Sequence, residues 1–209
     1  MSIQTELTRI TNAKAAIKTA IEGKGVTVPS DTLLDGMASL IESIEAGGGA
    51  TEPYIEEVID GNGDITNATL HGYTIIRNNA FYNCSKLALV SLSSGLTSIG
   101  NNAFYSCSKL ALTSLPSGLT SIGDSAFYNC SKLALTSLPS SLTSIGIYAF
   151  YGCSSLASLT FEGKPKSISN SAFNECTNLT TINVPWAPGA VANAPWGAIN
   201  ATINYNAGA

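Results

Sequence analysis

The chain has 209 residues, a formal net charge of −4 at pH 7 and only 11% charged residues. Its few lysines are scattered, so it lacks the dense basic stripe of a nucleic-acid-binding protein, and nucleic acid is not expected as a partner. The first residues lack a basic segment followed by an apolar one, and no run of 18 or more apolar residues occurs. We therefore expect synthesis in the cytoplasm without a signal peptide, and no insertion into a membrane.

Residues 1–46 are expected to form a helical hairpin. Apolar residues at helical spacing over 3–22, and again up to about residue 45, predict two amphipathic helices separated by Gly23 and Gly25. Two interpretations stay open. The helices pack on each other, or they form a docking or oligomerisation piece that makes the protein a homo-oligomer. The glycine-rich residues 47–53 are expected to be a linker.

Residues 54–75 are expected to be an N-terminal cap built as a β-hairpin. Its turn contains Asp60, Asn62 and Asp64, a spacing that superficially matches a calcium loop. However, the sixth position of such a loop would be Ile65, where glycine is needed, and the twelfth would be His71, where a bidentate glutamate is needed. A hairpin turn is therefore predicted here, and no metal site.

One unit of 23 residues is written five times between residues 76 and 184. Its most regular columns are the phenylalanines Phe81, Phe104, Phe127, Phe150 and Phe173 and the cysteines Cys84, Cys107, Cys130, Cys153 and Cys176. A fixed period of this length predicts a solenoid in which each unit buries its apolar side against the next. An odd number of cysteines in one column favours reduced, buried side chains over disulfides, and ligands in a line do not suit a metal.

The repeat can be compared with a known family. The pattern L-x-x-L-x-L-P-x-x-L-x-x-I-x-x-x-A-F-x-x-C, in residues 110–130 and again in 133–153, resembles the BspA-type leucine-rich repeat. The resemblance implies an α/β repeat: a right-handed leucine-rich-repeat solenoid with parallel β-rungs, here with the helical hairpin in front. One departure is Thr113 and Thr136, where the family has an aliphatic residue. Either the strand shifts locally, or neighbouring leucines form an exposed apolar column of Leu89, Leu112 and Leu135.

Residues 185–209 hold both tryptophans and are expected to form the C-terminal cap. This tail, and residues 24–29 of the head, resemble parts of bacteriophage virion proteins and their prophage relatives. That resemblance implies that residues 1–46 contact other virion proteins.

Nothing in the sequence predicts catalysis. His71 is the single histidine, and no serine or cysteine has a second candidate base at a recognisable spacing. The glycine-rich loops that hold nucleotide phosphates are also missing. We therefore expect no enzyme activity, no cofactor and no metal.

Two sets of outward residues are candidate binding sites. The first is the tyrosine that follows the core phenylalanine in four repeats, Tyr82, Tyr105, Tyr128 and Tyr151. Such rings either bind sugar or protein, or simply stack on one another and shield one edge of the solenoid. The second set lies on the sheet face, where solenoids commonly bind partners, and consists of Leu89, Ser91, Leu112, Ser114, Leu135 and Ser137.

Together these features predict a non-enzymatic ligand-recognition module. The favoured hypothesis is a phage or prophage structural or receptor-binding protein, associated with the virion, that displays the repeat surface to a cell-surface protein or glycan. One alternative is a BspA-like bacterial surface adhesin that binds host protein or glycan. Another is a purely structural spacer that recognises nothing.

Overall fold

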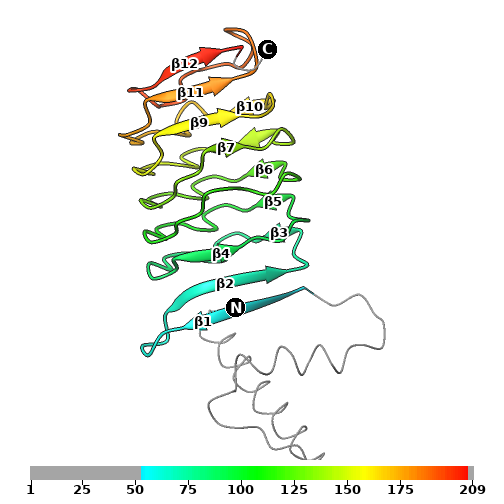
Figure 1. The fold of residues 1–209 in the computed structure, drawn as a ribbon, viewed down its shortest axis with the longest axis vertical. Helices are drawn as coiled ribbons and strands as arrows, with labels where there is room; N and C mark the ends of the chain where they lie inside the picture. The colour runs from blue at the N-terminus through cyan, green and yellow to red at the C-terminus, as the bar shows by residue number, and fades with distance from the viewer. Residues whose placement is uncertain (1–52, 207–209) are drawn as a thin grey trace, which may run out of the picture. The chain divides into compact units, whose positions relative to one another are not determined.

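The described part of the chain is a stack of β-rungs, one for each repeat (Figure 1). The computed structural model describes residues 53–206, so the helical hairpin predicted for residues 1–46 and the linker predicted after it lie outside the described residues, apart from Pro53. Within the described part there are twelve short strands: β1 (Tyr54–Ile59), β2 (Ile65–His71), β3 (Ile75–Ile76), β4 (Leu89–Ser91), β5 (Ser98–Ile99), β6 (Ser121–Ile122), β7 (Ser137–Leu138), β8 (Ser144–Ile145), β9 (Ser158–Phe161), β10 (Ser167–Ile168), β11 (Thr181–Val184) and β12 (Thr202–Tyr205).

The strands form one continuous sheet and two shorter ones. The continuous sheet has the order β10-β8-β6-β5-β3, and the shorter ones have the orders β1-β2-β4 and β12-β11-β9-β7. Only β1 and β2 pair antiparallel; the other pairs are parallel, as in Ile99 opposite Ile122, one repeat further along. The expected solenoid of parallel rungs is therefore confirmed.

The α component of the expected α/β class is wrong for residues 53–206, where no α-helix occurs. The Ala-Phe-x-x-Cys segments are turns in which backbone N–H groups alternate between bonds within the turn and bonds to the next rung. For example, the Phe104 N–H donates to the Ala126 carbonyl over 2.8 Å. Because these donors are used between rungs, no helical ladder can form along the segment. No helix among the described residues could cross a membrane.

The core runs the length of the stack and is built from the repeated columns. Each core phenylalanine ring stacks on the next, as in Phe104 and Phe127, with centroids 5.3 Å apart and planes 6° apart. Each cysteine beyond the first donates its thiol to a phenylalanine carbonyl of the preceding rung, as in Cys130 Sγ to Phe104 O at 3.0 Å. All five cysteines are free, and four of them are buried as predicted, whereas Cys84 is half-buried.

The first rung is less covered than the others. Ala80 is exposed and Cys84 is only half-buried, whereas the corresponding Ala103 and Cys107 are fully buried. The Ala-Phe-x-x-Cys turn of each repeat packs against the turns of its neighbours, and the turn of the first repeat has such a neighbour on one side only. Burial still raises the pKa of Cys84 to about 11, with smaller contributions from nearby carboxylates, so this thiol is not reactive at neutral pH.

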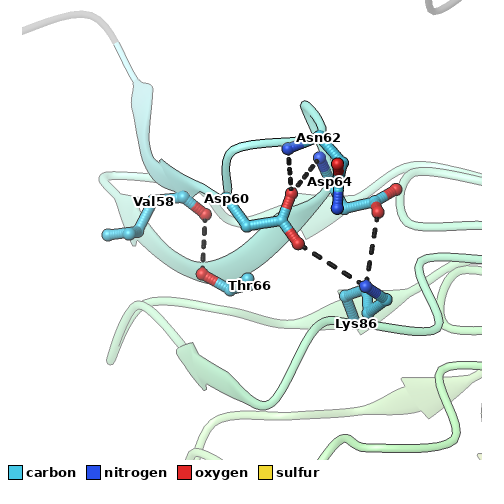
Figure 2. Close-up of polar contacts among 6 residues, drawn as sticks. All are labelled: Val58, Asp60, Asn62, Asp64, Thr66 and Lys86. Atoms are coloured by element: carbon cyan, nitrogen blue, oxygen red, sulfur yellow. Dashed lines mark hydrogen bonds and ion pairs between the residues drawn. The ribbon is translucent and has the colours of Figure 1, made fainter.

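The β1–β2 hairpin forms the N-terminal end of the described stack, and Leu70 of β2 is buried against the core. Figure 2 shows its turn, where one Asp60 carboxylate oxygen accepts the N–H groups of Asn62 (2.9 Å) and Asp64 (3.1 Å). These two hydrogen bonds lower the pKa of Asp60. The Lys86 ammonium lies 3.5 Å from Asp60 and 3.6 Å from Asp64, so a lysine occupies the place that a cation would need.

At the C-terminal end of the described stack, residues 185–206 add a further rung. Trp196 follows Phe173 by one repeat length, is fully buried, and donates its ring N–H to the Ala192 carbonyl over 2.7 Å. Both tryptophan rings contact Phe161, with centroids 5.4 Å away for Trp186 and 5.7 Å for Trp196. Two large rings therefore take the place of the next phenylalanine in closing the core.

Candidate functional site

The face that carries the candidate leucines and serines is interrupted at residues 110–115. On this face β4 pairs with β2 alone and β7 pairs with β9 alone, and no strand lies between β4 and β7. Two backbone hydrogen bonds still join this rung to its neighbours, from Ala111 N–H to Ala88 C=O (2.9 Å) and from Ala134 N–H to Leu112 C=O (3.1 Å). The N–H groups of residues 112–115 donate no hydrogen bond within the described chain. One edge of β4 is therefore open.

The interruption follows from the two threonines that depart from the repeat pattern. Thr113 and Thr136 stand where the first copy has the buried Val90, but both are exposed, because burying a hydroxyl without a partner is unfavourable. In the third copy Leu135 turns inward instead and is only 2% exposed. The prediction of an exposed Leu89, Leu112 and Leu135 column is therefore wrong: Leu89 is 59% exposed, while Leu112 is half-buried. The alternative, a local shift of the strand, is correct.

The interruption opens a hollow of about 490 Å³ between the first and second copies. No charged residue lines it, and its wall combines aliphatic side chains with hydroxyls. Four of the predicted site residues lie in this wall: Leu89, Ser91, Leu112 and Ser114. We call this feature the β4 hollow. Leu135 and Ser137 lie outside it, and the Ser137 hydroxyl donates to Glu162 over 2.7 Å.

The four predicted tyrosines form a continuous stack. Their ring centroids are 4.9, 4.7 and 4.4 Å apart from Tyr82 to Tyr151, and their planes differ by 15°, 6° and 3°. Partial desolvation and the neighbouring phenols raise the pKa of Tyr105 and Tyr128. The inner rings cover one another's faces, so they are not open platforms for a sugar. The tyrosines therefore stack on one another, and ligand binding by the stack stays a prediction.

The opposite, five-stranded sheet has a groove that the sequence analysis missed. It holds about 430 Å³ and is lined by Ser98, Ser121, Ser144 and Ser167 with Gly100, Gly123 and Gly146, beside Asn78, Asn101 and Asp124. We call it the serine–glycine groove. The side-chain oxygen of each Asn or Asp accepts the backbone N–H one repeat later, over 2.7 to 2.9 Å. Glycines 23 residues apart were the signal that could have revealed it.

The described residues show no arrangement suited to catalysis or metal binding. Among residues 53–206 no group of three His, Cys, Asp or Glu side chains is close enough to hold a metal ion. His71 lies 3.1 Å from Glu56 and stacks on Tyr54 at a centroid distance of 4.3 Å, on the two strands of the terminal hairpin. These contacts fasten β1 to β2, and no nucleophile belongs to the pair.

Comparison with known proteins agrees with this architecture. A family model described as a BspA-type leucine-rich repeat region matches residues 74–190 in six copies, where the sequence analysis expected five. No curated protein matches the chain. The comparisons give no support to the expected resemblance to virion proteins.

Several solved structures are similar. A leucine-rich repeat protein of T. pallidum is 27% identical with a TM-score of 0.54, and the match covers 73% of this chain and 79% of that one. A leucine-rich repeat protein from Bacteroides ovatus (65% of this chain, 46% of that one) and a leucine-rich cell surface protein from Faecalibacterium prausnitzii (65% and 55%) are each 22% identical, with a TM-score of 0.43. The first of these shares the rung architecture, and the family match spans more than half of the chain. The chain therefore belongs to the BspA-type leucine-rich repeat family.

Proposed function

We propose that this chain is a non-enzymatic recognition module of the adhesin type, which binds an extended segment of a partner protein in the β4 hollow. The observation that carries the proposal is the open edge of β4 beside a hollow without charged residues. A module of this kind acts by holding its partner, which is consistent with a family of repeat proteins whose extended surfaces bind ligands. We further propose that it acts at a bacterial cell surface.

The choice of an extended peptide rests on hydrogen bonding. A strand that is paired on one side leaves backbone N–H and C=O groups on the other side, and an added strand satisfies them. Elsewhere on this face the next rung of the protein does so, but residues 112–115 do not. The exposed Leu89 and the half-buried Leu112 offer apolar contact, while Ser91 and Ser114 offer hydroxyls. An uncharged wall favours a segment with small or apolar side chains.

The test is a selection from a random peptide library against the full-length chain, followed by fluorescence polarisation with the best peptide. Leu89→Asp is expected to weaken binding by about tenfold or more, since it places a charge in the hollow. Ile75→Asp is the matched control, because Ile75 is a strand residue of similar exposure, 52% against 59%, on the other sheet. Its affinity should stay within about twofold of the unmodified chain.

A second measurement tests the extended conformation. N-methylation of alternate residues of the selected peptide removes N–H donors, so one set of positions should abolish binding while the other set has little effect. The hollow is refuted as the site if Leu89→Asp and Ile75→Asp lose the same amount of peptide affinity, or if the library yields no binding peptide. Either result would leave the interpretation of the chain as a structural spacer. Protease treatment of intact cells tests the proposed location, because a chain at the cell surface should be digested. Recovery of the chain in purified virions would instead support the phage hypothesis.

A further inference from the structure

The fourth repeat breaks the polar pattern at one corner of the solenoid. Two consecutive positions of the repeat hold small polar residues in four copies: Asn78-Asn79, Asn101-Asn102, Asp124-Ser125 and Asn170-Ser171. In the fourth copy the same two positions hold Ile147 and Tyr148. Both of these residues are exposed, Ile147 by 51% and Tyr148 by 40%. Since the other copies keep the same rung geometry with small polar residues, the fold does not need an aromatic side chain here.

The backbone at Tyr148 makes this exception more informative. The second of the two positions has a left-handed conformation in four copies, with φ of 59° at Asn79, 54° at Asn102, 52° at Ser125 and 54° at Tyr148. Asparagine tolerates this region well, whereas a bulky side chain there is rare and strained. Strain of this sort tends to persist where a side chain serves a function, and the inference runs from the observed outlier to the function.

The ring of Tyr148 is presented differently from the rings of the tyrosine stack. It meets Tyr151 at 90° with a centroid distance of 5.7 Å, and this is its single ring contact within residues 53–206. At least one of its faces is therefore not covered by another aromatic ring. In the stack, by contrast, Tyr105 and Tyr128 have a parallel ring on each side.

Ile147 and Tyr148 do not line the serine–glycine groove themselves, but Ile147 connects this corner to it through the backbone. It follows Gly146, the last glycine of the groove, and its N–H donates to the Asp124 carboxylate over 2.7 Å. The second carboxylate oxygen of Asp124 and the amide nitrogens of Asn78 and Asn101 make no hydrogen bond within the described chain. Asp124 is the single charged residue among those that line the groove.

We propose that Ile147, Tyr148 and the Asn78–Asn101–Asp124 wall of the serine–glycine groove form a binding site for a neutral carbohydrate chain. Tyr148 is 40% exposed, and an exposed aromatic ring packs against the C–H face of a sugar while its hydroxyl adds a polar contact. The groove supplies amide donors, a carboxylate acceptor and hydroxyls at the regular spacing of the rungs, about 4.8 Å. A linear chain of hydroxyl-rich sugars matches this row, whereas an anionic polymer is disfavoured by the lone carboxylate and the lack of cations.

The site is independent of the β4 hollow, which lies on the opposite sheet. It is tested by NMR titration of the full-length chain carrying carbon-labelled tyrosine rings with four probes: chitohexaose, cellohexaose, laminarihexaose and mannohexaose. At least one probe is expected to bind and to shift the Tyr148 signals more than those of Tyr82. Tyr148→Asn restores the residue of the first two copies, so it should fold with an unchanged or higher melting temperature while the affinity falls by about tenfold or more.

The matched control is Ile199→Asn, which changes an 89% exposed aliphatic side chain elsewhere on the surface. Its affinity for the sugar should stay within about twofold, and Leu89→Asp should likewise leave sugar binding unchanged. The proposal is overturned if none of the four probes binds at millimolar concentration, or if Tyr148→Asn binds as tightly as the unmodified chain. Neither result would affect peptide binding at Leu89, so the two proposals fail separately.

Discussion

Replacing Gly123 by alanine is expected to destabilise the solenoid, because this glycine lies where two rungs come close together. A Cβ atom here would press on the Asn101 side-chain oxygen. It would also lie 2.7 Å from the Asn101 backbone nitrogen and 2.8 Å from the Gly100 carbonyl carbon. Two of these three atoms belong to the backbone of the preceding rung, so rotating a side chain cannot relieve the contact. The rung itself has to move.

The size of the effect follows from what that movement disturbs. Overpacking in a closely packed region costs about 1–3 kcal/mol. The displaced rung also strains hydrogen bonds from Gly123 N–H to Ile99 C=O (2.8 Å) and from Asp124 N–H to Asn101 Oδ1 (2.9 Å). Weakening the equivalent of one such bond adds about 1 kcal/mol. We expect the free energy of unfolding to fall by about 2–4 kcal/mol.

Urea denaturation followed by circular dichroism measures this change. Gly118→Ala is the matched control, because a Cβ there would meet nothing closer than the Leu96 carbonyl oxygen at 3.8 Å, an ordinary contact. That variant should keep its stability or gain up to about 1 kcal/mol from the smaller freedom of the unfolded chain. If Gly123→Ala unfolds at the same urea concentration as Gly118→Ala, the close approach of the rungs does not explain why glycine recurs at positions 100, 123 and 146.

Three further outcomes are expected. Burial raises the pKa of the Cys107 thiol to about 12 and the pKa of the Cys130 thiol well above its ordinary value. A disulfide reagent at pH 8 should therefore react with these two thiols only after unfolding, and rapid reaction of the folded chain would contradict this. Because the pKa of Tyr105 and Tyr128 is raised, the folded state favours the neutral phenol. Its stabilising contribution is complete below about pH 10 and is lost as the pH rises through the higher folded pKa, which ultraviolet titration and melting curves together would show. Trp196→Ala should cost about 3–5 kcal/mol in urea denaturation, since it empties a fully buried site at the end of the stack; a loss below about 1 kcal/mol would mean that the ring does not close the core.

The site was less predictable than the fold. The sequence predicts the tyrosines along one edge but leaves stacking and ligand binding as alternatives, and the distances between rings show that the rings stack. Four of the six sheet-face candidates do lie together in the β4 hollow. Leu135 does not, because a strand position beside a threonine can turn either way, and the local register sets which side chain faces inward.

The serine–glycine groove and the Tyr148 corner were missed for a related reason. Each depends on an interaction between repeats rather than on the residue itself. Gly123 matters through the neighbouring rung, and Tyr148 stands out through its backbone conformation and its perpendicular ring. In a repeat protein a copy that breaks the pattern is visible in the sequence, but the structural effect of the change depends on the residues of the neighbouring repeats that it contacts.

The 23-residue period and the apolar side chains of its Phe and Cys columns together determined that rungs stack with those columns inside, because apolar residues that recur in every unit leave water by packing against their own copies. Only the tertiary structure decided where that regularity fails. Leu135 and Thr136 compete for a single inward position, and the outcome depends on the hydrogen bonds and packing offered by the neighbouring rungs. The open edge of β4, and with it the candidate site, is a consequence of that local competition.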